Sequence, residues 1–115
     1  MKTYKDLVVW DKSIELAKAV YELTGLFPKE EIYGLTSQMR RAVVSISSNI
    51  AEGKLRGTDP EFKRFLLIAF ASGGELETQL EIAKKLPEME KLNYADVESL
   101  LLEVMKMLNK LISQI

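Results

Sequence analysis

Residues 93–115, NYADVESLLLEVMKMLNKLISQI, decide the fold. Their apolar positions recur every three or four residues, which is the period of one helix face and not the alternation of a strand. Asn93 at the start, with Asp96 soon after, is typical of a helix amino terminus. A near-heptad seam this long requires other helices to cover it. The seam consists of Val97, Leu100, Leu101, Val104, Met105, Leu108, Leu111, Ile112 and Ile115.

Residues 59–86 predict the helix that precedes this one. Asp59, Pro60 and Glu61 have the order N-cap, proline at the first helical position, and acid in the first turn. Pro87 closes the segment, because proline cannot continue a helix. Its apolar stripe consists of Phe62, Phe65, Leu66, Ala69, Phe70, Gly73, Leu76, Leu80 and Ala83.

Residues 7–24 and 31–52 show the same helical period. Gly25 and Gly53 are the glycines expected just after the two carboxyl ends. The first stripe consists of Trp10, Ile14, Ala17, Tyr21 and Thr24, widened by Val20 and Leu23. The second consists of Leu35, Met39, Ala42, Val43, Ile46 and Ile50, while Val44 and Ala51 lie on another side.

Four amphipathic segments joined by short links, with no strand pattern, predict an all-α fold. We expect an up-down-up-down antiparallel four-helix bundle. The chain has 115 residues, and we find no internal repeat, low-complexity tract or linker. We therefore expect residues 1–115 to form one domain.

The composition argues against an enzyme. The chain has no cysteine and no histidine, so it lacks the usual metal ligands, thiolate nucleophiles and proton carriers. The carboxylates Glu75, Glu77 and Glu81 do not share one helix face, and we expect neither a metal site nor a cofactor. No apolar run reaches the length of a signal peptide or a membrane span. We therefore expect a cytoplasmic protein that does not bind membranes.

Polar and glycine residues interrupt two of the predicted helices. Ser45 and Asn49 are four residues apart in the second helix, with Ser47 and Ser48 between them. They indicate either close packing around a satisfied amide, or a polar ligand site or interface. Gly73 and Gly74 each cost about 1 kcal/mol inside a helix, so a neighbouring helix must approach closely. That helix belongs to the same chain or to another copy, which makes Asn49, Gly73 and Gly74 candidate interface residues.

Positive charge gathers around the link between the second and third helices, although the net charge of the chain is −1. Between residues 40 and 64, six basic residues stand against Glu52, Asp59 and Glu61, a balance of +3. This cluster is either a solvated bundle end or a rim that contacts phosphates. The candidate nucleic-acid-binding residues are Arg40, Arg41, Lys54, Arg56, Lys63 and Arg64.

Three stretches carry a family resemblance across nearly the whole chain. The first is LFP at residues 26–28 with Glu31 and YGL at 33–35. The second runs from QMRRA at residues 38–42 to NIAEG at 49–53, and the third is ELETQL at residues 75–80. Together they resemble the four-helix-bundle family encoded within intervening sequences of 23S ribosomal RNA genes. The accessory variability determinant of diversity-generating retroelements is similar.

The resemblance implies a helical bundle without enzyme activity that assembles into a homopentamer. The accessory determinants bind nucleic acid and a reverse transcriptase. By this likeness we expect a non-catalytic oligomeric adaptor that contacts RNA or a ribonucleoprotein partner through the basic rim. The alternative is a scaffold that binds protein only.

Overall fold

Helices make up the secondary structure of residues 2–115, which the computed structural model describes. Short 3-10 turns precede two of the long helices, at Tyr4–Asp6 and Lys29–Glu31. No strand occurs within these residues. The long helices are α1 (Val8–Thr24), α2 (Leu35–Leu55), α3 (Asp59–Ala83) and α4 (Ala95–Gln114).

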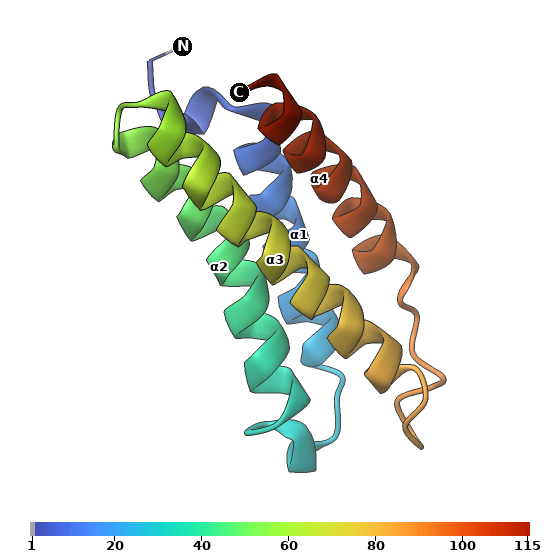
Figure 1. The fold of residues 1–115 in the computed structure, drawn as a ribbon. Coiled ribbons are helices and arrows are strands. Elements are labelled where there is room, and N and C mark those ends of the chain that lie inside the picture. Colours follow the sequence, from blue (N-terminus) through green and yellow to red (C-terminus); the bar gives the residue numbers. More distant parts are fainter. Residues whose placement is uncertain (1) are drawn as a thin grey trace.

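The four helices lie along one another in a single elongated bundle (Figure 1). The backbone of α1 lies close to α2 and α4, and that of α3 also lies close to α2 and α4, whereas the diagonal helices have no such close backbone approach. Successive helices run in opposite directions, so both chain ends lie at the same end of the bundle as the α2–α3 turn (Figure 1). The predicted up-down-up-down four-helix bundle is confirmed.

One apolar core runs through the bundle and takes residues from every long helix. Leu16 of α1, Ile46 of α2, Leu66 of α3 and Leu108 of α4 are each fully buried. Removing such side chains from water is the main stabilising contribution to folding, at roughly 1.5–3 kcal/mol for each.

The predicted stripe of α1 is correct only in part. Val20, Leu23 and Thr24 are buried as expected. Ile14 and Tyr21, expected in the core, are 42% and 44% exposed. In the first part of the helix the buried residues precede the predicted ones by one position. One of them is Ser13, a polar residue that a search for apolar periodicity does not select. The buried residues of α1 are Val9, Ser13, Leu16, Val20, Leu23 and Thr24.

Both predicted ends of α2 are corrected. The helix begins at Leu35 and not at Glu31, because the backbone of Gly34 leaves the helical path. Glu31 lies in the preceding 3-10 turn, and its Oε1 accepts a hydrogen bond of 3.1 Å from the Leu35 N–H. At the other end Gly53 lies inside the helix, which continues to Leu55. The glycine that makes the turn is Gly57, with a φ of +86° that other residues rarely adopt.

Smaller corrections apply to the last two helices. Thr58, and not Asp59, is the N-cap of α3, and its side chain accepts from the Glu61 N–H. Helix α3 ends at Ala83, three residues before the predicted end. Tyr94, and not Asn93, is the N-cap of α4, although the Asn93 Oδ1 accepts a hydrogen bond of 2.9 Å from the N–H of Ala95, the first residue of the helix.

Candidate interaction surfaces

The polar residues in the middle of α2 join it to both neighbouring helices. Ser47 Oγ lies 2.8 Å from Ser13 Oγ of α1, in a buried hydrogen bond. Ser45 Oγ lies 2.8 Å from Ser72 Oγ of α3. The Asn49 side chain is half-buried and donates to Ser45 O at 2.8 Å and to Ser45 Oγ at 3.0 Å. These contacts support close packing within one chain as the role of Ser45 and Asn49.

The two adjacent glycines of α3 have different surroundings. Gly73 is buried, and a side chain at this position would collide with Met105 of α4. The close approach that this glycine predicts therefore comes from a helix of the same chain. Gly74 is half-exposed, and nothing lies within 4 Å of where its Cβ would be.

The six candidate nucleic-acid-binding residues do not form one patch. Arg40 and Arg41 lie near the start of α2, whereas Lys54 and Arg56 lie at its end. The fifteen residues from Arg41 to Arg56 span roughly 22 Å at the rise of an α-helix. Lys63 and Arg64 join the second group from the first turns of α3. The predicted cluster is thus divided between two parts of the bundle.

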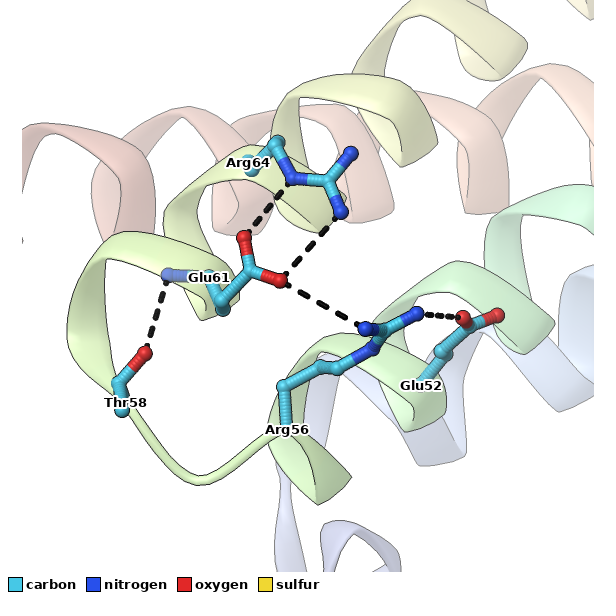
Figure 2. Close-up of polar contacts among 5 residues, drawn as sticks. All are labelled: Glu52, Arg56, Thr58, Glu61 and Arg64. Carbon is cyan, nitrogen blue, oxygen red and sulfur yellow. Dashed lines mark hydrogen bonds and ion pairs between the residues drawn. The ribbon is translucent and has the colours of Figure 1, made fainter.

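Acidic neighbours neutralise two of these arginines (Figure 2). Arg56 lies 2.9 Å from Glu52 and 3.7 Å from Glu61, and Arg64 Nε donates to Glu61 at 2.9 Å. The hydrogen bond from Arg64 lowers the pKa of Glu61 below its ordinary 4.5. Because all four side chains are substantially exposed, these pairs contribute little stability but cancel the local charge.

The other four basic residues differ in how firmly they are held. Arg40 donates to Thr24 Oγ1 at 2.9 Å and lies over the Tyr21 ring at 4.5 Å, so it is fixed against α1. Lys54 lies over the Phe62 ring at 5.3 Å. Within residues 2–115, Arg41, Lys54 and Lys63 form no ion pair. These three cations are the part of the predicted rim that is available to an anionic partner.

An open groove of about 600 Å³ lies along the α1–α2 side. Three of its lining side chains are apolar and exposed: Tyr21 at 44%, Ile32 at 55% and Val44 at 44%. Arg40 and Arg41 line its polar side. This groove was not predicted, although the position of Val44 outside the core stripe was a signal for it.

A second pocket, of about 430 Å³, lies between α2 and α3. It was not predicted, because its lining comes from residues far apart in the sequence. The lining residues are Gln38, Arg41, Ala42, Ser45, Glu75 and Gln79.

Residues 2–115 contain neither a metal-binding group of acidic side chains nor a membrane-spanning helix. No three Asp or Glu side chains come together in an arrangement that could hold a metal ion. No helix there is long and apolar enough to cross a membrane.

Comparison with known proteins places the chain in a family. Residues 5–110 match the model of a family described as 23S rRNA-intervening sequence protein. A crystal structure at 1.70 Å resolution from Bacteroides thetaiotaomicron is similar, with a TM-score of 0.77 and 27% sequence identity. The match covers 91% of this chain and 98% of that one, which is described as a protein with unknown function from the S23 ribosomal protein family. A comparison with curated proteins gives no match. The chain belongs to the 23S rRNA-intervening sequence protein family.

Proposed function

We propose that this chain is a non-catalytic cytoplasmic interaction module that associates with further copies of itself through the α1–α2 groove. The observation that carries the proposal is the cluster of Tyr21, Ile32 and Val44, which are apolar, exposed and gathered around one groove. Contiguous apolar surface of this kind marks interaction sites on soluble proteins.

A homopentamer is the assembly that we propose. Its support is the resemblance to the intervening-sequence family, whose members assemble in this way. A ring requires that each copy meet its neighbours through two different surfaces, since a single self-complementary patch closes a dimer. The groove is one of these surfaces, and the half-exposed backbone at Gly74 on α3 is a candidate for the other.

Val44→Glu tests the groove. It places a charge in the apolar part of the contact, and we expect the assembly to dissociate at concentrations where the unmodified chain remains associated. Sedimentation velocity over a dilution series measures the change. Leu102→Glu is the matched control, because Leu102 is 56% exposed on α4, outside the groove. Equal sedimentation of Val44→Glu and the unmodified chain would contradict the assignment.

Contact with RNA or a ribonucleoprotein is the second candidate function. Arg41, Lys54 and Lys63 are unpaired among the described residues, and the family description names 23S rRNA. A ring would repeat these cations around its surface and make weak phosphate contacts multivalent. The alternative to this second function is a scaffold that binds protein and makes no phosphate contacts.

Fluorescence anisotropy with a labelled structured RNA at low salt tests this second function. We expect Lys54→Glu combined with Lys63→Glu to weaken binding at least tenfold and to reduce its salt dependence. Lys106→Glu with Lys110→Glu, on the exposed side of α4, is the control of equal charge change. If the unmodified protein does not bind RNA at micromolar concentration, or if both double variants lose the same affinity, RNA binding through Lys54 and Lys63 is contradicted. The scaffold that binds protein only would then be favoured.

A further inference from the structure

The pocket between α2 and α3 is built by the packing of the two helices. Ser45 and Ser72 hold the antiparallel helices together at 2.8 Å. Gln38 lies seven residues before Ser45, and Gln79 lies seven residues after Ser72, so the two amides face one another across the interface. Arg41, Ala42 and Glu75 line the pocket between these points, and of these Ala42 is buried and small. Its short side chain leaves the space of about 430 Å³ open.

The first observation that points to a ligand in this pocket is the side chain of Gln79. Its side chain is only 9% exposed, and its Oε1 is buried with no hydrogen-bond partner anywhere in residues 2–115. A buried carbonyl without a donor is destabilising, and native proteins rarely leave one. A ligand with an N–H group in the pocket would supply the missing donor.

The charges at the pocket indicate what kind of ligand fits. Arg41 lines it from α2 and Glu75 from α3. Neither forms an ion pair within the described chain. A simple anion would be repelled by Glu75 and a simple cation by Arg41. A small molecule that carries both a negative and a positive group can pair with Arg41 and Glu75 at the same time.

We propose that this pocket binds a free α-amino acid. The carboxylate pairs with the Arg41 guanidinium and the ammonium pairs with the Glu75 carboxylate. Gln79 turns its amide so that Oε1 leaves its buried position, faces the pocket and accepts from an ammonium N–H. The Gln38 amide, at the same end of the pocket as Gln79, supplies a further polar contact. The pocket lies within the 300–1,000 Å³ range of small-molecule sites, so the ligand side chain also has room. The proposal does not depend on self-association or on RNA.

Titration of the ¹⁵N-labelled full-length chain with three probes tests the proposal. The probes are L-alanine, propanoate, which lacks the ammonium group, and ethylamine, which lacks the carboxylate. We expect L-alanine to shift the side-chain amide signals of Gln38 and Gln79 with a saturable dissociation constant in the millimolar range. Propanoate and ethylamine should bind at least tenfold more weakly. Equal shifts with all three probes, or no saturable shift with L-alanine, would overturn the proposal.

Variants of the two charges and of Gln79 make the test specific. Arg41→Gln and Glu75→Gln should each weaken L-alanine binding about tenfold, and both residues are exposed, so the fold is retained. The double variant Arg41→Glu with Glu75→Arg should regain affinity, because a zwitterion can bind in the reversed orientation. Gln79→Met should raise the melting temperature by removing the unpaired carbonyl, yet lose binding. Unchanged affinity in the single-charge variants would contradict the assigned contacts.

Discussion

Gly53→Ala should lower the free energy of unfolding by roughly 2 kcal/mol. A Cβ at this position would lie 2.7 Å from Phe65 Cβ and 3.3 Å from the Phe62 carbonyl oxygen. Neither atom is the end of a flexible chain, so α2 and α3 would have to separate. Alanine is intrinsically a better helix former than glycine by about 1 kcal/mol, and the collision outweighs that gain. Urea denaturation followed by circular dichroism measures the difference.

Gly74→Ala is the matched control for this prediction. Gly74 also lies inside a helix, but nothing stands within 4 Å of its Cβ position. We expect the helix propensity of alanine to raise the free energy of unfolding by about 0.5–1 kcal/mol. A stable Gly53→Ala protein would contradict the tight α2–α3 packing. The control applies to the dissociated protein, where loss of stability in Gly74→Ala would contradict the open space at its Cβ. Loss of assembly in Gly74→Ala would support the second ring surface proposed on α3.

Ile46→Ala should lower the free energy of unfolding by about 3 kcal/mol. Ile46 is fully buried in the middle of α2, so shortening it removes apolar contacts and leaves a cavity. Val44→Ala, two residues away on the same helix, is the control because Val44 is 44% exposed. In the dissociated protein we expect it to change stability by no more than about 0.5 kcal/mol. Equal losses in the two variants would mean that the assigned core face of α2 is wrong.

The sequence predicted the four helices and their order because each carries a long apolar stripe. The stripe of α2 was predicted correctly, since Leu35, Met39, Val43 and Ile46 are all buried. Helix boundaries were less accurate, because they depend on the local backbone at Gly34 and on side chains such as Glu31 that replace a missing hydrogen bond.

The stripe of α1 was predicted only in part, for a reason specific to its residues. Its exposed and buried faces both carry large apolar side chains, and the buried one contains Ser13. A serine in a core seam is acceptable only because Ser47 of α2 lies beside it. That partner is 34 positions away along the chain, so no local pattern could identify it.

The candidate sites were predicted unevenly. The sequence located the basic residues, and the spacing of Glu52 with Arg56 and of Glu61 with Arg64 already allowed the pairing that the structure shows. The α2–α3 pocket could not be predicted, because the burial of Gln79 and its lack of a partner depend on how the two helices pack.

Light scattering coupled to size-exclusion chromatography tests the proposed self-association most directly. The 260/280 nm absorbance ratio of the same peak reports any nucleic acid that copurifies. We predict a mass near five chains for the unmodified protein, and a mass near one chain for Val44→Glu. A single-chain mass for the unmodified protein at every concentration would contradict the proposal, and the exposed groove of Tyr21, Ile32 and Val44 would then require a different partner.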